Sequence, residues 1–157
     1  MKANIGIPEN HLETIGLLLN KLLADEYVLY TKTKRHHWNV EGEHFYSLHL
    51  FFDTQAEQIE GFIDEIAERT RSLGHFAEGS LRHFLELTRL LDTGKSGSKA
   101  SEMIQELLQD HETIIGQMRQ DIDHIGNELK DVGTSDFLTG LMEQHEKMAW
   151  MLRAFLK

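Results

Sequence analysis

Histidines and carboxylates gather in one stretch of the chain, with types and spacing that would suit a metal site. A histidine stands just before a turn, a His-x-x-x-Asp pair follows, and an Asp-x-x-x-Glu pair begins eleven residues after the first aspartate. Imidazole nitrogen and carboxylate oxygen without sulfur suit iron, manganese or zinc, and iron is the natural choice for redox chemistry. The candidate ligands are His37, His49, Asp53, Asp64 and Glu68.

A helix would place the His/Asp pair and the Asp/Glu pair on one face but far apart. Asp53 and Asp64 would lie roughly 16 Å apart along the axis, whereas the ligands of one ion lie about 2 Å from it. If both pairs are ligands, an antiparallel copy of the same helix must supply the second pair, as an isologous dimer would. A solvated acidic face opposite an apolar one remains the alternative interpretation of this stripe.

A di-iron centre buried inside one helical bundle is the rival arrangement. Such centres use Glu-x-x-His on two helices. Glu41 and His44 have that spacing but fall in a turn, and Asp121 with His124 is only an analogue. Because no second copy follows on the last helix, the sequence disfavours a buried centre.

Apolar residues recur with helical periodicity in four long segments, and no stretch alternates for long enough to predict a strand. We therefore expect an all-α, ferritin-like four-helix bundle with a crossover between the second and third long helices. A shorter helix is expected in that crossover, followed by a flexible joint, GKSGSK. The expected long helices are about Glu9–His37, Glu43–Leu73, Ser98–Leu129 and a last one with its N-cap at Thr134 or Ser135; the short helix is about Ser80–Leu91, and the joint is 94–99.

Bulk composition limits the class of protein. The chain of 157 residues has no cysteine and a formal net charge of −10, which predicts one domain over 1–157 and excludes disulfides and thiolate sites. Its start has no apolar block of signal-peptide length, and its most apolar early run is too short to span a membrane. We therefore expect a cytoplasmic protein without a membrane segment. The acidic balance also argues against direct binding to nucleic acid.

The sequence resembles a known family, the Dps family of mini-ferritins. The family signature is a His-Trp-x-x-x-Gly turn, then His-x-x-x-Asp, then Asp-x-x-x-Glu-Arg. The late segment TSDFLTGL and a tryptophan near the end are also similar to the family. The matching signature positions are His37, Trp38, Gly42, His49, Asp53, Asp64, Glu68 and Arg69.

The resemblance implies a hollow homo-dodecamer that oxidises Fe(II), with hydrogen peroxide preferred over oxygen, and stores the ferric mineral. It implies two irons at each site, with His37, His49 and Asp53 from one chain and Asp64 and Glu68 from its partner. Zinc or manganese could substitute for iron. Trp38 is either a packed aromatic residue or an electron donor near the iron.

The resemblance also implies acidic iron-entry pores near the junction of the third and fourth long helices, where Glu128, Asp131 and Asp136 fall. Relatives that bind DNA directly usually carry a lysine-rich tail, and here only Lys2 precedes the first helix. We therefore expect no direct DNA binding. Two other functions stay open: a nucleoid-compacting protein with incidental iron binding, and a metal-free structural bundle.

Overall fold

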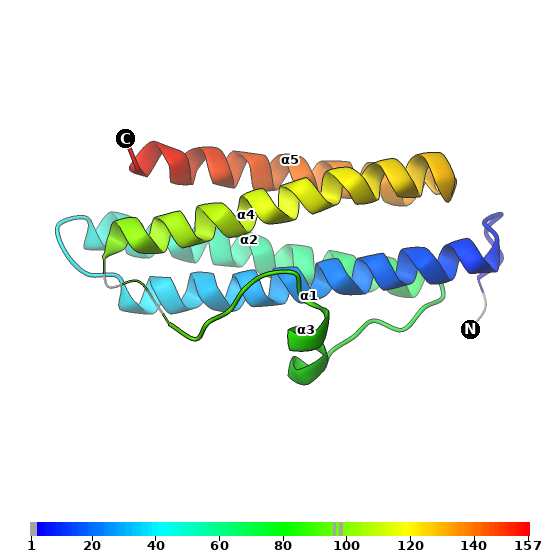
Figure 1. Ribbon diagram of the computed structural model, residues 1–157, viewed down its shortest axis with the longest axis horizontal. Coiled ribbons are helices and arrows are strands. Elements are labelled where there is room, and N and C mark those ends of the chain that lie inside the picture. Colours follow the sequence, from blue (N-terminus) through cyan, green and yellow to red (C-terminus); the bar gives the residue numbers. More distant parts are fainter. Residues whose placement is uncertain (1–2, 96, 98) are drawn as a thin grey trace.

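Four long helices lie side by side in the computed structural model, which describes residues 3–95, 97 and 99–157 (Figure 1). A short helix lies in the long connection between the second and third of them. The helices are α1 (Glu9–Asn39), α2 (Phe45–Ser72), α3 (Leu81–Leu87), α4 (Ala100–Asp123) and α5 (Val132–Phe155), and a π-helical turn, η1 (His124–Glu128), extends α4. The expected all-α bundle with an extra helix in its crossover is confirmed.

The crossover decides how the two helical pairs are oriented. α1 and α2 are antiparallel, the chain then returns along α1, and α4 therefore starts at the same end as α2 (Figure 1). α1 packs chiefly on α2, and α4 on α5. Each long helix turns an apolar stripe inward, as the periodicity predicts. Ile15, Leu19, Leu22 and Leu23 of the first stripe are all buried.

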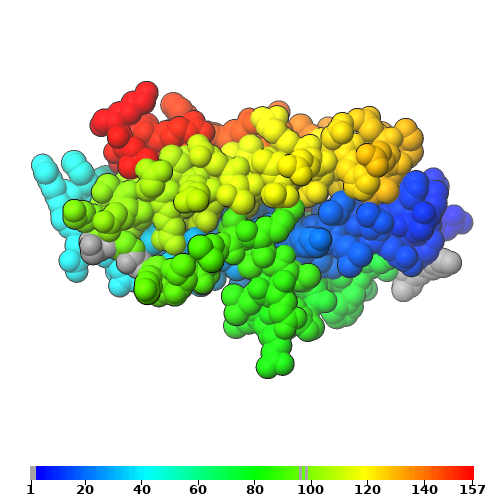
Figure 2. Space-filling model, viewed as in Figure 1, coloured from blue at the N-terminus to red at the C-terminus, as the bar shows by residue number. Residues whose placement is uncertain are grey.

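The crossover is held to the bundle by buried charge. Asp25 of α1 is 1% exposed and accepts hydrogen bonds from the backbone N–H of Arg89 at 2.6 Å and from the Arg89 Nε at 2.7 Å. Arg89 also reaches Asp121 of α4 at 3.2 Å. Figure 2 shows the crossover and α3, in green, lying on the outside of the long helices.

Asp25 also explains why α3 is shorter than the expected helix of about Ser80–Leu91. Thr88 donates its hydroxyl to Asp25 Oδ1 at 2.9 Å, and Thr88 has extended backbone angles. The chain leaves the helix at this point because the buried carboxylate binds its side chain and the next backbone N–H instead.

The last long helix begins earlier than expected, and the N-cap at Thr134 or Ser135 was wrong. Asp131 is the cap, and its Oδ1 accepts a hydrogen bond from the Thr134 backbone N–H at 3.0 Å. Aspartate is as good a cap as serine or threonine. The third long helix ends in the π turn η1, and its expected start at Ser98 lies outside the described residues. No helix of the described chain is long and apolar enough to cross a membrane.

Candidate metal centre

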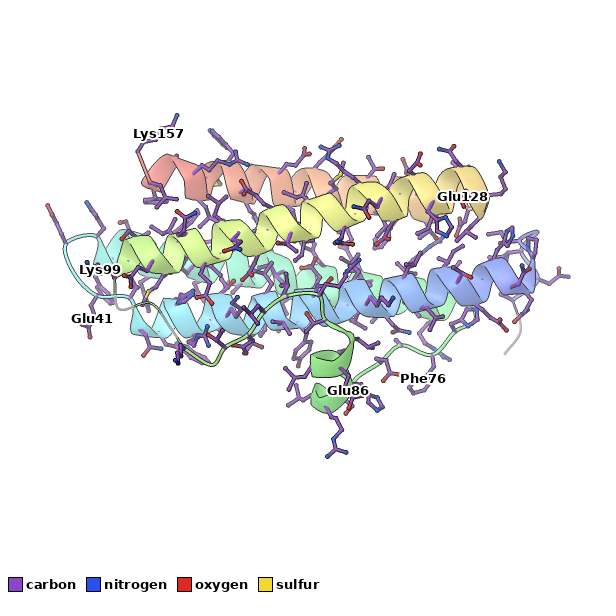
Figure 3. The ribbon with its side chains drawn as sticks, viewed as in Figure 1. Glu41, Phe76, Glu86, Lys99, Glu128 and Lys157 are labelled. Atoms are coloured by element: carbon purple, nitrogen blue, oxygen red, sulfur yellow. The ribbon has the colours of Figure 1, made fainter. Side chains whose placement is uncertain are left out.

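Two candidate ligands meet across the turn between α1 and α2. The imidazoles of His37 and His49 stack with ring centroids 3.9 Å apart. The turn depends on Gly42, whose φ of +103° is a conformation that residues with a Cβ rarely adopt. In Figure 3 the labelled Glu41 marks this end of the bundle.

Backbone hydrogen bonds fix both imidazoles. His37 Nδ1 lies 2.7 Å from the His49 carbonyl oxygen, and His49 Nδ1 lies 2.8 Å from the His37 carbonyl oxygen. A carbonyl can only accept, so each Nδ1 carries a proton, and the neutral form of each ring has its lone pair on Nε2. A second hydrogen bond of this kind is how metal-binding histidines are usually oriented.

Asp53 lies beside these histidines and is paired with a lysine. Its Oδ1 is 3.7 Å from His37 Nε2 and 2.7 Å from the Lys34 Nζ. The hydrogen bond from Lys34 lowers the pKa of Asp53 below its ordinary value, and the pKa of Lys34 is raised by the same bond. Asp53 is therefore a carboxylate at neutral pH, and an incoming cation would compete with the ammonium group.

Asp64 and Glu68 are exposed further along α2, away from the turn. The structure thus brings together His37, His49 and Asp53 but not the other two candidate ligands. Among the described residues of the single chain, no group of three or more histidine and carboxylate side chains is arranged to hold a metal ion. The donors form two separate half-sites: the His37/His49/Asp53 half-site and the Asp64/Glu68 half-site.

The neighbouring aromatic and histidine residues differ in their surroundings. Trp38 is 67% exposed, so in the single chain it is not a packed aromatic residue. His36 is buried, and its Nε2 lies 2.8 Å from Glu106 of α4. Burial lowers the pKa of His36 despite that carboxylate. His36 therefore joins α1 to α4 and does not face the half-site.

The three expected pore residues lie at the opposite end of the bundle, where Figure 3 labels Glu128. Glu128 and Asp136 are exposed, whereas Asp131 is only 4% exposed. Besides capping α5, the Asp131 carboxylate lies 3.4 Å from Arg69 Nη2. Both Asp131 oxygens are engaged with Thr134. Glu128 and Asp136 are exposed, and Glu128 Oε2 lies 3.0 Å from His124 Nδ1.

Lys34 was not among the residues predicted for the site, although its position carried a signal. Lys34 precedes His37 by three residues, which places both on one face of α1. Three polar residues of the bundle interior were not predicted either: Glu26, His111 and His145, each 0% exposed. The signal there was their occurrence at apolar positions of the helical repeat.

Comparisons with known proteins show the family of the chain. Residues 17–157 match the family model described as a ferritin-like domain. A low temperature-induced protein of Nostoc sp. is 44% identical over 99% of this chain and 87% of its own length. DNA protection during starvation protein 2 of Bacillus anthracis is 35% identical over 88% of this chain and 94% of its own.

A solved structure gives the same result. The Dps protein of Vibrio cholerae O1, described as a member of a broad superfamily of ferritin-like diiron-carboxylate proteins, superposes with a TM-score of 0.93. It is 29% identical, and the match covers 100% of this chain and 98% of that one. Fold and family model together define a ferritin-like protein. Within that class, the chain belongs to the Dps family of mini-ferritins.

Proposed function

We propose that the protein is a ferroxidase and iron store whose active sites form between two-fold-related chains of a homo-dodecamer. Fe(II) and hydrogen peroxide are its substrates, and oxygen is the poorer oxidant. The observation that carries this proposal is the division of the five donors into two half-sites on one chain, each incomplete alone.

The geometry of α2 supports an inter-chain site. Asp53 and Glu68 are separated by roughly 22 Å of helix at 1.5 Å per residue, which no side-chain motion can close. A two-fold axis crossing α2 between them would put the His37/His49/Asp53 half-site beside the partner's Asp64/Glu68 half-site. An isologous pair makes two such sites at once.

The donor set suits iron as the substrate. Carboxylates from both chains would hold and bridge two cations, and the two Nε2 lone pairs are already aimed by their backbone bonds. Peroxide takes one electron from each of two ferrous ions and two protons, which leaves two ferric ions and two waters. Zinc or manganese would bind the same donors without this reaction. Trp38, next to His37, would supply an electron when peroxide meets a single iron.

Electrostatics supports cation uptake and argues against direct DNA binding. The formal charge of −10 per chain attracts cations and repels a phosphate backbone. Glu128 and Asp136 would line the iron-entry pore, with Asp131 holding the loop between them. A plasmid gel shift at moderate salt, without divalent cations, tests the alternative of nucleoid compaction. Retardation of the plasmid would support that alternative.

The first experiment measures oxidation directly. Metal-free protein is loaded anaerobically with ferrous iron, given a pulse of hydrogen peroxide, and followed by ferric absorbance and residual peroxide. We expect fast ferric formation with peroxide consumed, and slower oxidation when oxygen replaces peroxide. The variant Asp64→Asn with Glu68→Gln should assemble normally, as judged by light scattering, and oxidise iron no faster than buffer does.

The second experiment tests whether the site is shared between chains. A His49→Ala chain and the Asp64→Asn/Glu68→Gln chain are each inactive alone under the proposal. When the two are co-expressed, half of the sites in each mixed dimer regain every donor, so random pairing should restore about one quarter of the wild-type rate. A site within one chain would give no recovery at all.

A further inference from the structure

A row of three buried polar side chains crosses the bundle interior. His145 of α5 lies at its centre. Its Nε2 is 3.0 Å from Glu26 Oε1 of α1, and its Nδ1 is 3.0 Å from His111 Nδ1 of α4. Phe62 of α2 packs its ring 5.4 Å from the His145 ring. All three polar side chains are 0% exposed.

His111 is the last of these three side chains, and within the part of the sequence that the structure describes no carboxylate is paired with its ring. Among the described residues its Nε2 has no hydrogen-bond partner. The one carboxylate in this row of three side chains, Glu26, lies on the far side of His145. If His111 were protonated, its Nε2–H would be buried without an acceptor, and its positive charge would lie beside a second imidazole, that of His145. Burial first, and His145 second, hold the pKa of His111 well below its ordinary value.

The other groups around His111 do not compensate for such a charge. On α1, Lys32 is positive, and on α4 its partners Asp110 and Glu106 lie 2.6 and 3.1 Å from its Nζ. α5 contributes His145. From α2, Phe62 packs on His145 and carries no charge. Asp110 and Glu106 are therefore already paired with Lys32, and Glu26 is paired with His145.

We propose that His111 is an acid-sensing group of the bundle, so that proton uptake at this residue drives the four helices apart. The unfolded chain would protonate this histidine near pH 6.5, whereas the folded chain resists protonation. Because the unfolded state then binds more protons, stability is lost as the pH falls below about 6.5. The inference does not depend on the proposed ferroxidase function.

The test compares the wild type with His111→Leu, which has similar volume and no titratable group. Guanidinium unfolding of the metal-free assembled protein is measured at pH 7.5 and 5.5 and at equal protein concentration. Between pH 7.5 and 5.5 the folding equilibrium constant should fall about tenfold more in the wild type than in His111→Leu, because only the wild type has this histidine to protonate on unfolding. Equal pH dependence in both proteins would overturn the proposal.

His83→Gln is the matched control, because His83 is exposed and its pKa is raised by Glu78. Its removal should leave the acid lability in place. A second measurement needs no variant: deuterium exchange at the imidazole C2 of wild-type histidines, resolved by mass spectrometry across pH. We expect the titration of His111 in the folded protein to lie well below the ordinary range of a histidine pKa. An ordinary titration near pH 6.5 in the folded protein would refute the proposal even if His111→Leu failed to fold.

Discussion

The Lys34 ammonium nitrogen lies 2.7 Å from Asp53 Oδ1, the oxygen that also lies nearest to His37 Nε2. The positive Lys34 side chain is thus ion-paired with Asp53, the carboxylate of the His37/His49/Asp53 half-site. The half-site is thereby neutralised before any cation arrives, and its affinity for metal includes the cost of displacing the lysine.

Replacing Lys34 should therefore tighten the binding of metal. In Lys34→Gln the pKa of Asp53 rises toward its ordinary value but stays well below 7, so the carboxylate remains ionised and unpaired. Removing a unit positive charge about 4 Å from a divalent cation in a solvated site is worth about 2 kcal/mol, or about thirtyfold in affinity. Anaerobic titration with Fe(II) or Zn²⁺ measures it, with Lys21→Gln, an exposed lysine of the same helix, as control. Weaker binding in Lys34→Gln would mean that the lysine helps to hold the site together.

Gly42→Ala should loosen the same half-site through the backbone. No atom lies within 4 Å of the Cβ that alanine would add, but φ is +103°, so the cost is conformational and about 1–2 kcal/mol. The reciprocal bonds of His37 and His49 span this turn, so we expect a lower Tm together with weaker Zn²⁺ binding. Gly116→Ala, in the open middle of α4, should instead stabilise the protein slightly. An unchanged Tm in Gly42→Ala would contradict this account of the turn.

Substitutions of Asp131 and Asp136 should have different effects: the first should lower stability, and the second should slow iron uptake. Asp131→Ala removes the N-cap of α5 and leaves Arg69 without its carboxylate, which should cost about 1–2 kcal/mol of stability. Asp136→Ala removes an exposed charge and should leave thermal unfolding unchanged while slowing iron uptake into the shell. Thermal denaturation and stopped-flow iron entry distinguish them. Equal stability of both variants would refute the capping role.

The sequence was sufficient for the all-α class and for the number and order of the helices. The helical repeat predicted the four long helices, and the spacing of Asp53 and Asp64 already indicated that one chain could not complete the site. Helical rise and rotation are local properties, so they can be counted along the chain.

What the sequence did not predict depends on contacts between distant segments. The N-cap of α5 could have been Asp131, Thr134 or Ser135 by residue type, and Asp131 is the one that also meets Arg69 of α2. The end of α3 depends on Asp25, more than sixty residues earlier. Glu26 of α1 and His145 of α5 likewise become partners only when the two helices face each other across the bundle core. Periodicity describes the faces of single helices and not which side chains meet between them.

The crossover joins two helical hairpins that are otherwise complete. α1 with α2 and α4 with α5 each make their main contacts within the pair, while the exposed segment 91–95 is the covalent link between them. Asp25 with Arg89 and Lys32 with the Leu91 carbonyl fasten the link to α1. Because buried residues of both pairs share one hydrophobic core, a protease that cut after Lys95 would leave two fragments that stay associated as a nicked, non-covalent bundle.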